Sequence, residues 1–283
     1  MGLRPARRHH QVARQHGHLR RRAHARARGL HLRARRARLP RGRHHRSRRA
    51  RPLRETRVTP ILGIVTIGQT PRPDLAEAFG AEAPHAQVRV AGALDGMLAE
   101  DLAALQDLKT SGPRDLEYPL LVRLASGAHI EVPLDRLVPL VTSAARKLAA
   151  DGASVIVVAC AGAFPDVPCP VPVLLPGRIV PAVAGALSRT RRVGIVTPNR
   201  AQVPYAERKW RVDGFEPTVT WASPSRDDEM ARAADELRGA DLDLIVIDCM
   251  GHADDARRAM AQWTGKLVIA AQSVVARVAG AIV

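Results

Sequence analysis

The stretch LIVIDCMGHADD, residues 244–255, passes from four consecutive aliphatic residues into an acid, a cysteine, a glycine and a histidine. A short apolar run rich in β-branched residues is typical of a strand that is buried on both faces of a parallel sheet. The polar residues that follow mark the carboxyl end of this strand, and a helix is expected from about Ala253. Cys249 is therefore predicted to lie at the carboxyl end of a buried strand.

A second stretch, SVIVVACAGAFPD at residues 154–166, repeats this pattern and places Cys160 at the same point, 89 positions earlier. Each half of the chain also begins with a related strand, ILGIVTI at residues 61–67 and RRVGIVTP at residues 191–198. This recurrence predicts two similar α/β lobes. Because ligands of open α/β sheets bind outside the carboxyl ends of the strands, both cysteines are expected at a ligand-binding cleft.

From Val58 onward, strand-like runs alternate with Ala-rich segments of helical period, which is typical of βαβ units. The predicted fold class is α/β, with two Rossmann-like lobes whose mainly parallel sheets face each other across a cleft. Residues 58–175 form the first lobe and residues 176–267 the second, so each carries one of these two cysteines, and residues 268–283 are expected to return to the first lobe. Residues 118–134 break the alternation, because two strand runs about a Ser-Gly turn predict a hairpin.

The first 57 residues differ sharply in composition from the rest. They contain 21 Arg, no Lys, eight of the 11 His and one acid, Glu55, whereas the remainder has 23 basic and 26 acidic residues. No Ile, Phe, Tyr or Trp occurs before Val58. Such a segment cannot bury enough apolar surface to offset the entropy of ordering, so we expect residues 1–57 to be a disordered basic tail.

Three interpretations of this tail stay open. Arg-rich runs neutralise phosphates, which would suit a nucleic-acid-binding arm. Targeting peptides are likewise Arg-rich and poor in acids. The third interpretation, which we favour, is translation of GC-rich DNA upstream of a true start near Val58. A secretory signal is not expected, because no apolar run of the needed length occurs.

Composition and missing motifs exclude several functional classes. No apolar stretch reaches the roughly 18 residues that a membrane span needs. Three cysteines without a secretion signal argue against a disulfide framework and for the cytoplasm. Neither a nucleotide-binding glycine motif nor the GxSxG of serine hydrolases occurs. Aromatic residues make up only 3% of the chain, which argues against nucleic-acid binding by the folded part.

Seven motifs follow one another along the chain: ILGIVTIGQTPRPD, GALDG, SGAHIEV, LLPGRIVPAV, QVPYAERKW, IDCMGHADD and SVVARVAG. In this order they resemble AroM-type proteins, a branch of the aspartate/glutamate racemase superfamily, which includes hydantoin racemases and arylmalonate decarboxylases. The resemblance covers nearly all of residues 58–283 and none of the basic tail. It implies two Rossmann-like lobes with the site in the cleft between them.

The resemblance also implies roles for two cysteines. In the racemases, cysteines from opposite lobes flank the substrate α-carbon, and one removes the proton that the other returns on the opposite face. Carried over, Cys160 and Cys249 take these roles. The racemases commonly follow these cysteines with Asn-Thr and Thr-His, whereas this chain has Ala161-Gly162 and Met250-Gly251-His252. This departure argues against amino-acid racemisation.

A thiol suits proton transfer beside a carboxylate, since its reference pKa is about 8.5 and a helix N-terminus or a cation lowers it. Cys249 precedes the helix expected from Ala253, so the helix dipole and free amides are expected to favour its thiolate. The small residues after each cysteine let backbone N–H groups approach an anion closely. The alternative for each cysteine is a small buried hydrophobic residue, and Cys169, in a proline-rich run, has no catalytic context.

Further substrate-binding residues are expected at the ends of the strands. They are Thr66, Gln69, Thr70, Ala161, Gly162, Thr197, Asn199, Met250, Gly251 and His252. Turn and helix-cap roles are the alternative for the polar members of this set. Arg72 and Arg178, near helix starts, are candidates to clamp an acidic substrate, with exposure to solvent as the alternative.

The predicted function is a cofactor-independent racemase or isomerase that transfers protons beside a carboxylate or carbonyl of a small molecule. The alternative is a non-catalytic protein that binds a small acid in the same cleft. No cofactor is expected, and no metal, because Cys249 and His252 lack a clear second pair of ligands. The expected partners are a small carboxylate-bearing molecule and, as in relatives, a second copy of the chain.

Overall fold

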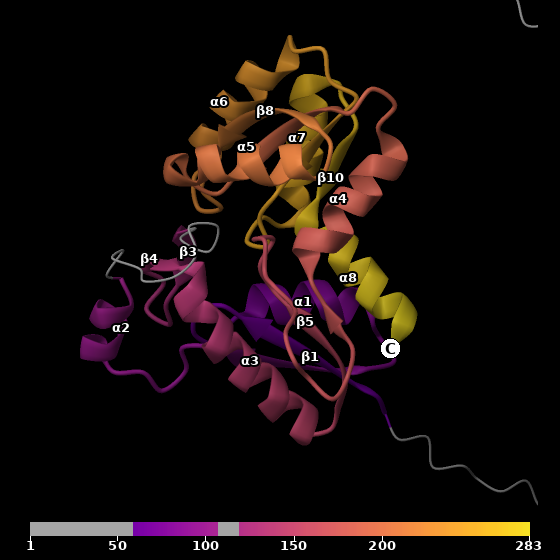
Figure 1. Ribbon diagram of the computed structural model, residues 1–283. Coiled ribbons are helices and arrows are strands. Elements are labelled where there is room, and N and C mark those ends of the chain that lie inside the picture. Colours follow the sequence, from indigo (N-terminus) through magenta and orange to yellow (C-terminus); the bar gives the residue numbers. More distant parts are fainter. Residues whose placement is uncertain (1–58, 107–118) are drawn as a thin grey trace, which may run out of the picture. The chain divides into compact units, whose positions relative to one another are not determined.

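The computed structural model describes residues 59–106 and 119–283, so the expected basic tail lies outside the described residues. The first part contains β1 (Ile61–Thr66), α1 (Pro73–Glu82), β2 (Gln87–Gly92), α2 (Ala99–Leu105), β3 (Pro119–Arg123), β4 (His129–Pro133), α3 (Leu134–Ala150), β5 (Ala153–Val158) and β6 (Val173–Leu174). The second part contains α4 (Pro176–Leu187), β7 (Arg192–Thr197), η2 (Arg200–Gln202), α5 (Val203–Val212), β8 (Glu216–Trp221), α6 (Asp227–Arg238), β9 (Leu244–Ile247), α7 (Asp254–Thr264), β10 (Val268–Ala270) and α8 (Ala271–Ile282). Figure 1 shows the alternation of strands and helices that the sequence predicts.

Two four-stranded sheets form the framework of the described residues. The strand order is β2-β1-β5-β6 in the first sheet and, read from the corresponding edge, β8-β7-β9-β10 in the second. Every strand pair within them is parallel. The two orders match strand for strand, so the repeat suggested by the paired sequence motifs is also a repeat of topology. The fold is α/β with two Rossmann-like lobes, as predicted.

Helices cover both faces of each sheet, which explains why the central strands β1, β5, β7 and β9 consist mainly of buried aliphatic residues. Successive side chains of a strand point to opposite faces. Leu62 and Ile64 of β1 therefore join one hydrophobic cluster, while Val65 joins the cluster on the other face, under α3. In the second lobe, α6 and α7 pack on the corresponding outer face. The continuous aliphatic runs are a consequence of this two-sided burial.

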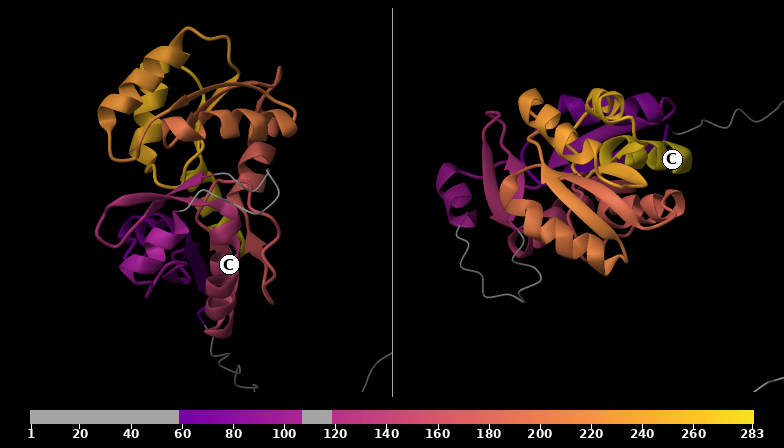
Figure 2. Two further views of the ribbon diagram at one scale, coloured as in Figure 1. Left: turned by 60° about the vertical axis from the view of Figure 1, so that its left-hand side comes forward. Right: turned by 90° about the horizontal axis from the view of Figure 1, so that it is seen from above.

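One hydrophobic cluster continues through both lobes. It joins the inner faces of β1 and β5 to those of β7 and β9, and it includes side chains of α1, α4, α5 and α8. The C-terminal helix α8 starts at the second sheet and runs to α1 of the first (Figures 1 and 2). β10 pairs with β9 in the second sheet, so the segment that returns to the first lobe starts after Ala270.

The predicted hairpin is formed by β3 and β4, which pair antiparallel beside the first sheet. Two hydrogen bonds connect it to the second lobe. Gln202 Nε2 donates to the Pro119 carbonyl over 3.0 Å, and Asn199 Nδ2 donates to Glu131 Oε1 over 3.0 Å. The hairpin therefore links the lobes at the carboxyl ends of their strands.

Candidate active site

A cavity of about 300 Å³ lies at the carboxyl ends of the strands of both sheets. Its walls come from the segments after β1, β5, β7 and β9 and from the β3–β4 hairpin. Cys160, which follows β5, and Cys249, which follows β9, both line it. The volume is at the lower end of the range for small-molecule sites, and it suits a small ligand.

The two cysteines share one local geometry. The N–H of Gly162 donates to Cys160 Sγ over 3.3 Å, and the N–H of Gly251 donates to Cys249 Sγ over the same distance. A Cβ at Gly162 would lie 3.0 Å from Leu120 Cδ2, and one at Gly251 would lie 2.9 Å from Pro224 Cγ. A larger residue at either position would have to displace a cavity wall. The paired glycines therefore allow both the tight turn and the open cavity.

Burial raises the pKa of both thiols. The pKa of Cys160 rises to about 12 because the protein desolvates the sulfur, and the N–H of Gly162 offsets this only in part. The pKa of Cys249 rises to about 11 for the same reason. The sequence-based expectation of a favoured Cys249 thiolate is not met, because α7 begins only at Asp254 and desolvation outweighs the hydrogen bond from Gly251.

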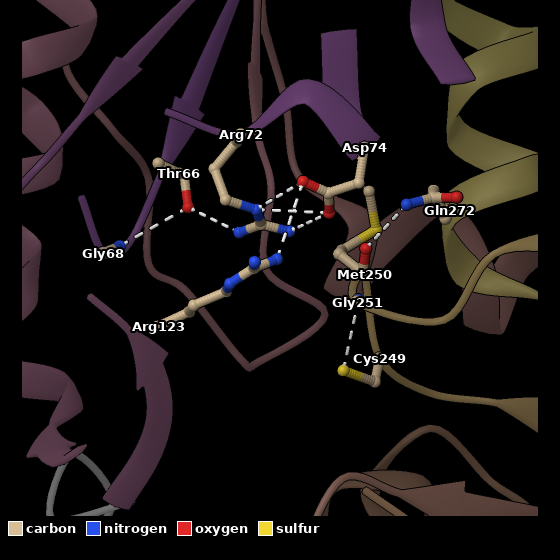
Figure 3. A network of polar contacts seen from close by, with 9 residues as sticks. All are labelled: Thr66, Gly68, Arg72, Asp74, Arg123, Cys249, Met250, Gly251 and Gln272. Carbon is tan, nitrogen blue, oxygen red and sulfur yellow. Dashed lines mark hydrogen bonds and ion pairs between the residues drawn. The ribbon is translucent and has the colours of Figure 1, made fainter. Parts of the chain in front are cut away.

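A polar network from the segment after β1 forms one wall of the cavity (Figure 3). The guanidinium of Arg72 donates to Thr66 Oγ1 over 3.0 Å and, through two nitrogens, to the carboxylate of Asp74. Burial opposes the ionisation of Asp74, but the hydrogen bond and charge of Arg72 outweigh it and lower the pKa of this carboxyl. Arg72 is thus held in place by a charged partner.

The hairpin adds Arg123 and His129 to the cavity. Arg123 Nη1 lies 3.9 Å from Asp74 Oδ1, a looser approach than the 2.6 Å ion pair of Arg72 with Asp74. Burial, followed by the charges of Arg123 and Arg72, lowers the pKa of His129 and so favours the neutral form of its imidazole. The guanidinium of Arg123 is therefore the cation of this wall that is less engaged with a carboxylate.

Asp248, the residue before Cys249, also lines the cavity, and its carboxylate pairs with Lys209, which is not among the lining residues. Lys209 Nζ lies 2.8 Å from Asp248 Oδ2, and Trp210 Nε1 donates to the same oxygen over 2.8 Å. The Lys209 ammonium also donates to the Ala161 carbonyl over 2.6 Å. The Lys209 ammonium therefore compensates the charge of the Asp248 carboxylate.

The structure brings about half of the expected site residues together. Those that line the cavity are Cys160, Cys249, Thr66, Ala161, Gly162, Met250 and Gly251. The remaining five have other partners: Gln69 bonds to Leu94 and Ala125, Thr70 to Asp95, Thr197 to Gln202, Asn199 to Glu131 and Gln202, and His252 to Ala222. For Gln69, Thr70, Thr197 and Asn199 these are turn and cap contacts, the alternative role for these side chains, whereas His252 is buried.

His252 is buried in the loop after β9. A ring nitrogen lies 3.1 Å from the Ala222 carbonyl, and the residue is 3% exposed. Burial lowers the pKa of His252 to about 4, although the bond to Ala222 opposes this. The imidazole of His252 therefore joins the loop after β9 to the segment after β8.

Several cavity residues had weak signals in the sequence. Arg72 was a candidate, and the structure places it in the wall, whereas Arg178 pairs with Asp166 at the surface. Asp74, Arg123, His129 and Gln202 were not selected, because a hairpin and a helix start do not mark functional residues by pattern alone. Among the described residues there is no group of three or more His, Cys, Asp or Glu that could hold a metal ion.

No helix within residues 59–106 and 119–283 is both long enough and apolar enough to cross a membrane.

Comparison with known proteins gives a family and a fold. The model of a family described as AroM protein matches residues 62–283. Arylmalonate decarboxylase superposes with a TM-score of 0.51 at 16% identity, covering 78% of this chain and 92% of that chain. No curated protein matches.

Two racemases are also similar in structure. Allantoin racemase from Klebsiella pneumoniae has a TM-score of 0.49 and 14% identity over 79% of this chain and 87% of that chain. Glutamate racemase from Aquifex pyrophilus has a TM-score of 0.48 and 17% identity over 79% of this chain and 84% of that chain. At 16% identity, the likeness to arylmalonate decarboxylase concerns the fold alone.

Proposed function

The chain belongs to the AroM protein family, and on that premise we propose that it is a cofactor-independent racemase or isomerase of a small carboxylate-bearing molecule. One observation carries the proposal: Cys160 and Cys249, from equivalent positions of two repeated sheets, line a single cavity. Two proton-transfer groups on opposite sides of one carbon are what inversion at that carbon requires.

The proposed step balances without an added reactant. In one direction the Cys249 thiolate removes the proton from the carbon beside the carboxylate, and the electron pair of the broken C–H bond delocalises into the carboxylate. The Cys160 thiol then donates its proton to the opposite face and becomes the thiolate. The reverse direction exchanges the two roles, so the substrate changes configuration and the total charge of the two sulfurs is the same before and after the reaction.

The charges of the cavity support an acidic substrate. Arg72 and Arg123 bring two positive charges, and Asp74 compensates one of them. The negative charge of the Asp248 carboxylate is compensated by the Lys209 ammonium, 2.8 Å away. One guanidinium charge is left for a ligand, which favours a small anion and stabilises the negative charge that develops on its carboxylate.

Solvent deuterium exchange tests the proposal. The protein is incubated in D₂O with a panel of amino acids, hydantoins and dicarboxylic acids, and NMR follows the loss of the α-proton. We expect exchange with at least one member, reduced at least about 100-fold by Cys160→Ser and by Cys249→Ser. Cys169→Ser is the matched control and should exchange like the parent. Exchange that persists in both cavity variants would contradict the two-cysteine mechanism.

A second candidate function is binding of a small acid without turnover. The raised pKa values of both thiols favour it, because neither sulfur is charged at pH 7 in the ligand-free protein. Calorimetric titration with the same panel separates the two functions. Saturable binding that is unchanged in both serine variants, together with no deuterium exchange at pH 7 or pH 9, would identify the binder.

A further inference from the structure

A single ammonium group connects the two cysteine-bearing loops. Lys209, on α5, donates to the carbonyl of Ala161, the residue directly after Cys160, over 2.6 Å. The same Nζ donates to both carboxylate oxygens of Asp248, the residue directly before Cys249, over 3.0 and 2.8 Å. An ammonium has three donors, and these contacts engage all three.

This connection is buried and held from several sides. The side chains of Lys209 and Asp248 are 7% and 4% exposed. Trp210, which is fully buried, donates its Nε1 proton to Asp248 over 2.8 Å. Burying an ion pair costs desolvation energy that an apolar pair of similar volume would avoid. Stability alone therefore does not explain the pair, whereas a requirement for fixed geometry does.

A hydrogen bond from another helix supports the Cys249 loop alone. Gln272 of α8 donates to the carbonyl of Met250, the residue after Cys249, over 2.9 Å. That bond supports one loop. Lys209 contacts both loops. Ala161 and Asp248 line the cavity, whereas Lys209 is not among the lining residues.

We infer that the Lys209–Asp248 pair is a positioning device that sets the distance between the Cys160 and Cys249 loops, an inference that rests on the proposed function. Lys209 is a positioning residue, because it acts through the loops and not on the substrate. The charges of the pair also reach the sulfur: besides the dominant effect of burial, Lys209 lowers and Asp248 raises the pKa of Cys160.

A thiol-bridging assay measures the spacing directly. In a Cys169→Ser background the chain keeps two thiols, and dibromobimane becomes fluorescent only when it joins both. The measured quantity is the bridged fraction divided by total alkylation with iodoacetamide, at a temperature well below the melting midpoint of each variant. The variants are Lys209→Met and the double change Lys209→Met with Asp248→Asn. Arg211→Met is the control, since it removes an exposed ion pair with Glu207 from the same helix.

The background and the Arg211→Met control should form the bridge efficiently. Lys209→Met and the double variant should lose at least about fivefold in the bridged fraction while both thiols stay alkylatable. The double variant keeps the test valid if Lys209→Met alone does not fold, because it leaves no unpaired carboxylate in the protein interior.

The outcomes distinguish this inference from the proposed function. A folded double variant that bridges as well as the background overturns the positioning role. If the Cys169→Ser background forms no bridge, both the two-cysteine mechanism and the positioning role are rejected. Bridging that depends on Lys209, with no deuterium exchange for any acid of the panel, upholds the positioning role and rejects the enzymatic function.

Discussion

The chemistry of single residues in this site follows from burial more than from neighbours in sequence. Cys249 precedes a helix in the sequence, yet desolvation at the strand end governs its pKa. His252 follows Cys249 by three residues, yet it is enclosed beside Ala222. In both cases the solvent that the fold removes outweighs the local context.

The thiol of Cys249 should show this in its reactivity. Below a pKa of about 11 the thiolate fraction rises tenfold for each pH unit, so the iodoacetamide rate at Cys249 should rise about tenfold per unit between pH 7 and pH 10. Mass spectrometry of the Cys249 peptide measures the rate, and circular dichroism at each pH confirms that the protein stays folded. A rate that levels off below pH 9 would indicate a thiolate favoured by the helix, contrary to this expectation.

His252 should make stability depend on pH. Its folded-state pKa of about 4 lies below the unfolded value near 6.5, so the unfolded chain binds the proton first as the pH falls. The contribution is fully present above pH 6.5 and is lost down to pH 4, by about 3 kcal/mol at 1.36 kcal/mol per unit. Urea unfolding at pH 7 and pH 4 measures this loss. The difference in unfolding free energy between the two pH values should be smaller in His252→Gln than in the parent. A difference of the parental size in His252→Gln would contradict this assignment.

At the scale of elements, packing between segments distant in sequence decides what the site contains. The β3–β4 hairpin supplies Arg123 and His129 to the cavity and is bonded to the second lobe at Pro119. The helix α8 leaves the second sheet and packs against α1 of the first. Both elements join the lobes. The hairpin is held by the hydrogen bond between Gln202 and Pro119, and α8 is held by its packing against α1.

The contact between α1 and α8 gives a prediction at this scale. A Cβ on Gly280 would lie only 2.1 Å from the Glu82 carbonyl oxygen. Because this oxygen belongs to the backbone, it cannot move away by a change of side-chain rotamer. Gly280→Ala should therefore destabilise the protein by about 1–3 kcal/mol, as overpacking does. A Cβ on Gly80 of α1 would meet no heavy atom within 4 Å, so Gly80→Ala should be neutral or stabilise by up to about 1 kcal/mol. Equal effects in chemical denaturation would contradict the close approach.

At the scale of the whole molecule, the two lobes share one core. A single apolar cluster contains residues of both sheets and of the helices between them, from Leu62 to Ala279. Neither sheet buries its inner face alone. The lobes are consequently expected to unfold together in one cooperative transition.

A chain that begins at Val58 should fold like the full chain. All three hydrophobic clusters lie between Ile61 and Val283, and the family match covers residues 62–283. The melting temperatures of the two chains should agree within about 2 °C, since a stability difference under roughly 0.5 kcal/mol shifts the midpoint by no more than that. A large loss on truncation would show that the Arg-rich segment contributes to the fold.

Much of this organisation could be predicted from the sequence because it depends on periodicity and repetition. The apolar runs of β1, β5, β7 and β9 indicated buried parallel strands, and the structure confirms them. The hairpin was also predicted from its turn. The rule that ligands bind outside the carboxyl ends of parallel strands placed each cysteine at the ligand-binding edge of its own sheet, and in the structure Cys160 and Cys249 line one cavity.

The contents of the cavity wall depended on the tertiary structure. Thr197 and Asn199 occupy positions as favourable in sequence as Thr66, yet they bond to Gln202 and Glu131. Arg123 and Lys209 carry no pattern that distinguishes them from surface cations. Side-chain direction and distant partners separate these cases, and neither is encoded in local periodicity.

By itself, the sequence determined two repeated α/β halves with a cysteine at the end of one buried strand in each, because hydrophobic periodicity and repetition are local properties of the chain. Only the tertiary structure decided that the sulfurs are desolvated, that Arg72 and Arg123 form the charged wall, and that Lys209 joins the two loops. The physical reason is that burial, net charge and cross-lobe hydrogen bonds arise from residues far apart in the chain, whose approach is set by the packing of the whole core.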